Sequence, residues 1–122
     1  MAVNTERAQV GTSRLALAAL TVSGGNIALD AALSDFYKVT LDANATLQAP
    51  TNPGAGRRFL LRVRQDGTGG RTLAFASIYR FPGGTTPTIS TGANVTDYLS
   101  FAYHETDIKW DYVGNCFNYA AP

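Results

Sequence analysis

Apolar residues recur at every second position in several short stretches of the chain, which is the pattern of half-buried β-strands. Residues 58–65 have this pattern, and so do residues 98–104 and 108–113, which we expect to pair across a turn at 105–107. In the last two stretches one face carries only apolar and aromatic side chains. These six side chains are expected in the core: Leu99, Phe101, Tyr103, Ile108, Trp110 and Tyr112.

Clusters of glycine, proline, asparagine and aspartate separate these stretches at short intervals. The runs between the clusters are about five to ten residues long, which predicts a small antiparallel β-sandwich or barrel. A short helix is the alternative for the first of them. The predicted strands are residues 15–21, 26–29, 36–41, 45–48, 58–65, 72–76, 88–90, 97–104, 108–113 and 117–119.

The stretch DGTGG, residues 66–70, follows an apolar strand, as a phosphate-binding loop does. Such a loop needs a helix behind it, because unpaired amides and the helix dipole bind the anion. Residues 71–81 are instead rich in threonine and aromatic residues, and no Gly-Lys-Ser/Thr motif occurs in the chain. We therefore expect a hairpin between residues 58–65 and 72–76, with the glycines supplying positive φ angles.

The composition limits the function. The 122 residues are enough for one domain that buries about two-thirds of its unfolded surface. A net charge of +1 argues against a nucleic-acid binder that releases counterions. No apolar run reaches the roughly 18 to 20 residues of a membrane helix. The arginines near residues 58–65 predict either a local basic patch or a solvated strand face; they are Arg57, Arg58, Arg62, Arg64 and Arg71.

Catalytic chemistry has few candidates. Cys116 is the only cysteine and is expected to be a small buried residue, and His104 is the only imidazole available to a hydrolytic triad. Four carboxylates lie close in sequence but belong to the predicted turn and outer face of one hairpin: Asp97, Glu105, Asp107 and Asp111. Asp66 and Asp107 are candidate calcium ligands without a repeated ligand spacing. We expect neither an enzyme nor a bound cofactor.

Aromatic residues offer candidates for sugar stacking. Trp110 is in phase with Ile108 and Tyr112, so its burial is expected. The tyrosines outside this pattern are expected to be freer to lie at the surface: Tyr37, Tyr79, Tyr98 and Tyr119.

Several phrases resemble a small β-domain of tailed-bacteriophage structural proteins, found at fibre ends and in head-surface proteins. The resemblance extends over about residues 26–119. It rests on LQAPTNP at 47–53, QDGTGGRT at 65–72, FPGG at 81–84 with PTIST at 87–91, and the step from Asn94 to Asp97 into an aromatic strand. It implies an all-β, antiparallel jelly-roll or galectin-like sandwich, commonly a homotrimer, without enzyme activity.

The resemblance implies a virion protein made in the host cytoplasm, with an N-terminal arm (1–14) and a β-sandwich domain (15–122). Our main hypothesis is a capsid decoration or head spike that binds the major capsid protein or another virion protein. Its contact residues would lie on the arm and at the start of the domain: Val3, Glu6, Arg7, Val10 and Leu15. The alternative is a tail-fibre knob that binds cell-surface glycan through Tyr37, Tyr79 and Tyr98. Neither hypothesis involves nucleic acid or a membrane.

Overall fold

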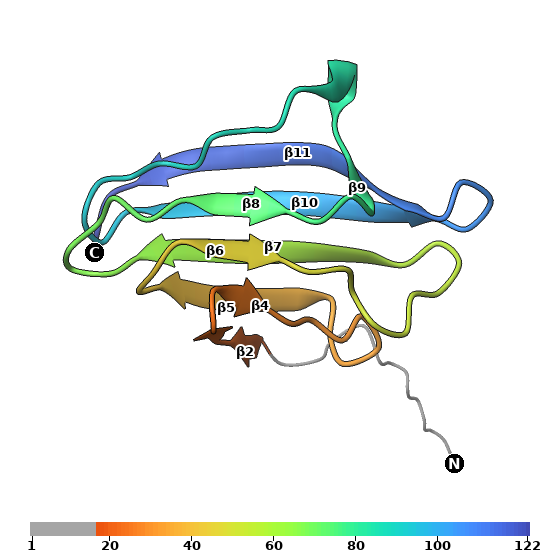
Figure 1. Cartoon of the computed structure of the whole chain (residues 1–122), viewed down its shortest axis with the longest axis horizontal. Coiled ribbons are helices and arrows are strands. Elements are labelled where there is room, and N and C mark those ends of the chain that lie inside the picture. The colour runs from red at the N-terminus through yellow and green to blue at the C-terminus, as the bar shows by residue number, and fades with distance from the viewer. Residues whose placement is uncertain (1–16) are drawn as a thin grey trace, which may run out of the picture.

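The computed structural model describes residues 17–122, which form two stacked mixed β-sheets (Figure 1). The larger sheet has the strand order β2-β5-β7-β10-β11-β9 and the smaller sheet β3-β4-β6-β8. The predicted all-β sandwich is confirmed. The strands are β2 (Ala18–Leu20), β3 (Val22–Ser23), β4 (Asn26–Ile27), β5 (Phe36–Leu41), β6 (Ala45–Leu47), β7 (Arg58–Gln65), β8 (Leu73–Phe75), β9 (Tyr79–Arg80), β10 (Thr96–His104) and β11 (Lys109–Tyr119), with one short 3-10 turn, η2 (Pro82–Gly84).

The chain from β2 to β8 alternates between the two sheets. β2, β5 and β7 lie in the large sheet, whereas β4, β6 and β8 lie in the small one. After each crossing to the other sheet the chain returns to the first sheet and runs in the same direction as before. Neighbouring strands in these two sets therefore pair in parallel: β2 with β5, β5 with β7, β4 with β6 and β6 with β8. The expectation of an antiparallel sandwich is wrong for them. It holds for β10, which pairs antiparallel with β11 as predicted and also with β7, a pairing that was not predicted.

The glycine-rich segment 66–70 does not form the predicted hairpin. It carries the chain out of the large sheet, where β7 ends, into the small sheet, where β8 begins. No helix follows it, so the phosphate-loop geometry is absent here. Gly69 has a φ of 72°, and a Cβ there would lie 2.7 Å from the carbonyl oxygen of Thr91. Glycine is therefore required at this position because two backbone segments approach closely.

The core lies between the facing sides of the two sheets. Tyr37, Leu61 and Leu99 form one cross-strand row on β5, β7 and β10, and all three are fully buried. Phe101 stacks on Phe59 with ring centroids 5.2 Å apart. Of the six core residues predicted for the β10–β11 pair, Leu99, Phe101 and Trp110 are buried, and Tyr103 and Tyr112 are partly buried against the core.

Ile108 is the exception, because 60% of its surface is exposed. It has a φ of 55° in the turn that precedes β11, so it does not belong to the strand whose pattern it seemed to begin.

Other element predictions also need correction. In the described part of the first stretch, residues 18–20 form β2, so the helix alternative is wrong there. Residues 88–90 form a loop instead of a strand, and residues 117–119 are the end of the single long strand β11. No helix among residues 17–122 has the length and apolar character of a membrane span.

Candidate contact face on the large sheet

The large sheet has the small sheet packed against one side only. In β7, residues 59, 61, 63 and 65 point into the core, and the residues between them point to the opposite side. All the described strands belong to these two sheets, so the outer side of the large sheet has no second layer among residues 17–122. We call this side the outer face.

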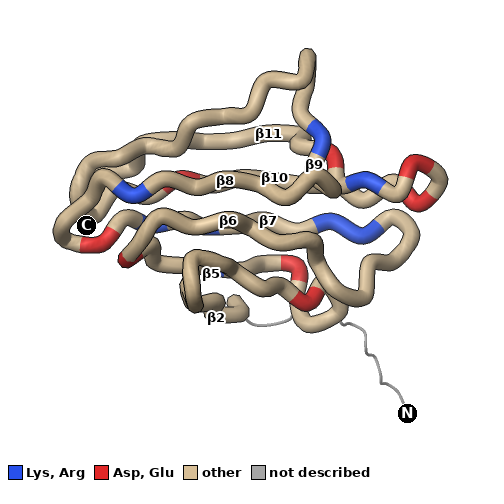
Figure 2. Tube along the Cα trace, in the orientation of Figure 1, with Lys and Arg blue, Asp and Glu red and all other residues tan. Residues whose placement is uncertain are grey.

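Four basic side chains of β5 and β7 lie on the outer face, whose other edge carries Lys109 and the ion pair between Arg80 and Asp111. Lys38 of β5 is the cross-strand neighbour of Arg62 of β7, and Arg58 and Arg64 lie on the same side of β7. No carboxylate of residues 17–122 forms an ion pair with any of the four. The acidic residues at the turn between β10 and β11 lie beyond one end of the sheet (Figure 2).

The five arginines singled out in the sequence therefore divide into two groups. Arg58, Arg62 and Arg64 share the outer face. Arg71 forms an ion pair with Asp66 at 3.0 Å, and the guanidinium of Arg57 donates a hydrogen bond to the carbonyl oxygen of Ala31 at 2.9 Å. The three unpaired arginines form a basic patch together with Lys38, which the sequence pattern did not single out.

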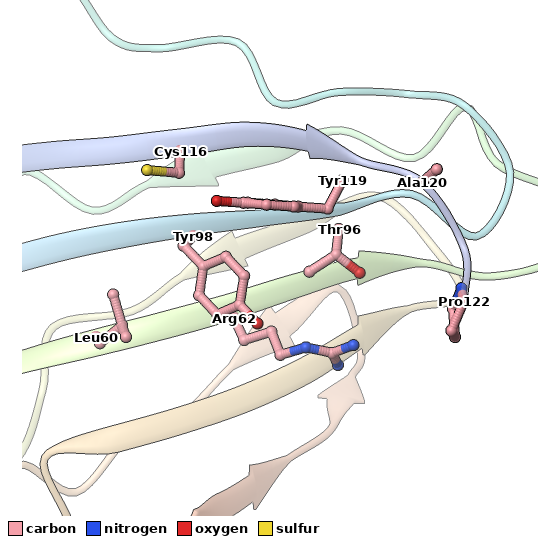
Figure 3. A pocket seen from close by; sticks show the side chains of 8 residues that line it. All are labelled: Leu60, Arg62, Thr96, Tyr98, Cys116, Tyr119, Ala120 and Pro122. Carbon is pink, nitrogen blue, oxygen red and sulfur yellow. The ribbon is translucent and has the colours of Figure 1, made fainter.

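A hollow of about 610 Å³ lies beside this patch (Figure 3). Arg62, Tyr98 and Cys116 form one cross-strand row along its floor, and Thr96 is paired with Tyr119 in a neighbouring row. The two tyrosine rings meet edge to face, with centroids 5.5 Å apart and an interplanar angle of 88°. The complete lining is Leu60, Arg62, Thr96, Tyr98, Cys116, Tyr119, Ala120 and Pro122.

Cys116 is exposed in this hollow, so its predicted burial is wrong. The register of β11 against β10 shifts between Ser100 and Phe101, where a bulge places one additional residue in β11. Residues after the bulge therefore face the opposite side from the one that the alternation before it predicts. The pairing of Cys116 with Tyr98 follows from this shift.

Two of the three tyrosines proposed for glycan contact are in the core. Tyr37 is fully buried and its hydroxyl donates to backbone carbonyls of residues 30 and 34, while Tyr79 is 5% exposed and donates to the carbonyl oxygen of Gln48 at 2.9 Å. Burial raises the pKa of both hydroxyls. A glycan cannot reach these rings, so the prediction is wrong for Tyr37 and Tyr79. Tyr98 lies on the outer face.

Residues 21–104 match the family described as "Putative phage tail fibre C-terminal domain". The chain belongs to this family. The match confirms the resemblance to a structural β-domain of phage virions and covers Leu60, Arg62, Thr96 and Tyr98 of the hollow. No curated protein matches the chain.

In the tail fibre domain Asp97 lies apart from the candidate carboxylates Asp107 and Asp111, which bind one arginine. Asp97 is 2% exposed and accepts hydrogen bonds from the backbone N–H groups of Ser90 at 2.6 Å and Asn118 at 2.8 Å. Asp107 and Asp111 instead share Arg80, at 2.9 Å and 2.6 Å. Hydrogen bonding to Arg80 lowers the pKa of Asp111.

The other candidates have local partners too. Nδ1 of His104 accepts a hydrogen bond from the backbone N–H of Asp107 at 3.3 Å. The carboxylate of Asp66 accepts hydrogen bonds from the backbone N–H groups of residues 68 and 69 and also forms an ion pair with Arg71. Within residues 17–122 no three His, Cys, Asp or Glu side chains gather as a metal site.

The predicted arm contacts of the tail fibre domain lie outside the described residues. These are Val3, Glu6, Arg7, Val10 and Leu15, and the proposed boundary at residue 14 lies there too. The outer face is thus the candidate surface that the described residues offer.

Proposed function

We propose that this tail fibre C-terminal domain is a non-enzymatic structural module of the virion that makes its contact through the outer face of the large sheet. The observation that carries the proposal is the one-sided sheet, with four unpaired cations beside a hollow lined by two tyrosines. Asp111 lies on the same face but is paired with Arg80, so the four cations of β5 and β7 have no carboxylate bound to them.

A purely structural role is supported by what the polar groups do. Asp97 connects the loop before β10 to the end of β11, and Arg80 connects β9 to β11 and to the turn before it. Hydrolysis of a glycosidic bond needs two carboxyl groups facing one space, with environments that separate their pKa values. Here the buried carboxylate and the arginine-bound pair point to different partners, so we assign them to stabilisation of the fold.

The location of the chain in the virion tests the proposal. Gold-labelled antibodies against the purified chain should bind at the distal ends of tail fibres in electron micrographs of intact phage. Label on the head would contradict this placement and support capsid decoration instead. In that case removal of residues 1–12 should abolish binding to the capsid while leaving a folded domain.

Competition for adsorption tests the contact face. The purified full chain, added to host cells before the phage, should slow phage adsorption. Leu60→Glu should abolish this inhibition, because it places a carboxylate in the floor of the hollow. Thr46→Glu is the matched control, since Thr46 is also partly buried on an outward strand position but lies on the small sheet. Equal inhibition by both variants would remove the outer face from the proposal.

A further inference from the structure

We propose that the outer face binds an acidic polysaccharide, with its basic side chains holding carboxylate or phosphate groups and Tyr98 stacking on a sugar ring. This inference rests on the proposed function, because it names the class of partner that the same face would recognise.

The arrangement of charge points to an anionic partner. Lys38 and Arg62 are direct cross-strand neighbours, and like charges in that position destabilise a sheet. Residues two apart on a strand are about 6.7 Å apart, so Arg58, Arg62 and Arg64 extend over roughly 20 Å of β7. No described carboxylate compensates them. An acidic chain lying along β7 would remove the repulsion and form charge-assisted hydrogen bonds with each cation.

The rings indicate that the partner contains sugar. Tyr98 is the cross-strand neighbour of Arg62, so a group held by the guanidinium lies next to an aromatic ring. Tyr119 meets Tyr98 edge to face and gives the hollow a second aromatic wall. A pyranose has an apolar face that packs on such a ring, while its hydroxyls bond to polar groups such as Thr96. The volume of about 610 Å³ lies within the range of small-molecule sites.

Two other partners fit less well. Nucleic acid is bound mainly through many phosphate contacts, and this chain carries a net charge of only +1. A second copy packed face to face about a two-fold axis would set these cations against their own equivalents. In a trimer the outer face would meet a different surface of the neighbouring copy, and that surface would have to supply carboxylates for all four cations. An acidic polysaccharide needs neither a strongly basic protein nor a self-complementary face.

The inference is tested with the purified full chain by affinity electrophoresis in gels that contain one polymer each. The probes are polygalacturonate, phosphomannan, neutral dextran and inorganic polyphosphate. We expect binding to one or both of the first two at physiological ionic strength and none to dextran. Binding to polygalacturonate would identify carboxylate as the recognised anion, and binding to phosphomannan would identify phosphate.

Charge variants locate the binding site. Arg62→Gln should weaken binding about tenfold, which is the loss expected for one charge-assisted hydrogen bond. Arg80→Gln removes the same charge from the β9 edge of the outer face, three strands from β7, where Asp107 and Asp111 already pair with it. This variant should change binding by less than about twofold. Equal losses in the two variants would mean non-specific attraction and would overturn the proposal.

Ring variants separate sugar recognition from charge alone. Tyr98→Ala should weaken binding to the acidic polysaccharide about tenfold, whereas Tyr98→Phe, which keeps the ring, should stay within about twofold. Neither should alter binding to polyphosphate, which has no sugar. Trp110 fluorescence verifies that each variant is folded, since this tryptophan is 1% exposed.

The proposal is overturned if neither acidic polysaccharide binds, if dextran binds equally well, or if single-stranded DNA binds as tightly. Gold label at the fibre ends together with no polysaccharide binding would refute this inference and leave the proposed function intact. Gold label on the head together with Arg62-dependent polysaccharide binding would refute the placement on the tail fibre and leave this inference intact.

Discussion

Gly69 and Gly70 provide a matched pair of substitutions that tests why the turn after β7 contains glycine. Both have positive φ angles, 72° and 76°, so alanine at either position carries a left-handed strain of about 1–2 kcal/mol. At Gly70 a Cβ would meet nothing within 4 Å. At Gly69 it would lie 2.7 Å from the carbonyl oxygen of Thr91 and 2.9 Å from the backbone nitrogen of Ala93.

The backbone around residues 91–94 is not free to move away. The carbonyl oxygen of Thr91 accepts the N–H of Gly70 at 2.8 Å, and the N–H of Asn94 donates to the carbonyl oxygen of Asp66 at 3.0 Å. Relief of the overlap would stretch these bonds, and overpacking of this kind costs about 1–3 kcal/mol. We therefore expect Gly69→Ala to lower the free energy of unfolding by about 2–5 kcal/mol and Gly70→Ala by about 1–2 kcal/mol.

Urea unfolding followed by the fluorescence of Trp110, the only tryptophan, measures both values. The two variants share chemistry, backbone conformation and sequence context, so the difference between them isolates the close approach to residues 91–93. Losses that agree within about 0.5 kcal/mol, the usual limit for independent small effects, would refute the reasoning and leave φ strain alone as the cause.

Three further predictions concern buried or paired polar groups. Gln65 is 1% exposed; its side chain accepts a hydrogen bond from the N–H of Arg71 and donates to the carbonyl oxygens of Arg71 and Ser90. Urea unfolding of Gln65→Leu should therefore give a free energy of unfolding that is lower by about 2–5 kcal/mol. The control Gln48→Leu, whose side-chain amide donates to Asn26 at the surface, should lose about 1 kcal/mol or less. Asp97→Asn keeps one acceptor oxygen for two N–H groups, so hydrogen exchange at Ser90 or Asn118 should accelerate; unchanged exchange at both would contradict the assigned bonds. Arg80 lowers the pKa of Asp111, so their interaction stabilises the fold at pH values above the ordinary aspartate pKa of 3.8 and is lost as the pH falls through the lower pKa of the folded state. The difference in free energy of unfolding between wild type and Asp111→Asn should therefore shrink from pH 6 to pH 2. A constant difference would exclude the ion pair as its cause.

Strand positions were predictable wherever one side of a strand is buried. The bounds of β5 and β7 agree with the sequence prediction because alternation between core and solvent is clear in both. Strand partners were predictable only for β10 and β11, which a short turn joins. For the other strands, alternation says which side is buried and nothing about which strand lies beside it. The segment 66–70 has the composition of a hairpin turn, yet it crosses between sheets, because β8 pairs with β6.

Errors in side-chain direction have two physical causes. The bulge in β11 reverses the phase of the residues after it, which brings Cys116 to the outer face. Tyr37 and Tyr79 lie in the core because each hydroxyl finds a backbone acceptor there, and this removes the usual penalty for burying a polar group. A sequence shows neither the bulge nor the acceptor.

The candidate site was only partly visible in the sequence. The arginines of β7 were interpreted as a solvated strand face, with a basic patch as the alternative. Lys38 and Tyr98 join Arg62 only through the strand order β5-β7-β10, which sets residues from three distant parts of the chain in one row. The hollow therefore depends on topology, which the local patterns did not specify.

Strand β7 shows how contact and stability can be separated in this fold. Its even-numbered positions carry the outer face, while Phe59, Leu61 and Val63 carry the core. Substitution of an outward arginine changes stability by about 0.5 kcal/mol or less, whereas truncation of an inward residue costs about 2–5 kcal/mol. The charge and shape of the outer face can therefore vary widely while the sandwich stays folded, because adjacent residues of one strand serve the two roles independently.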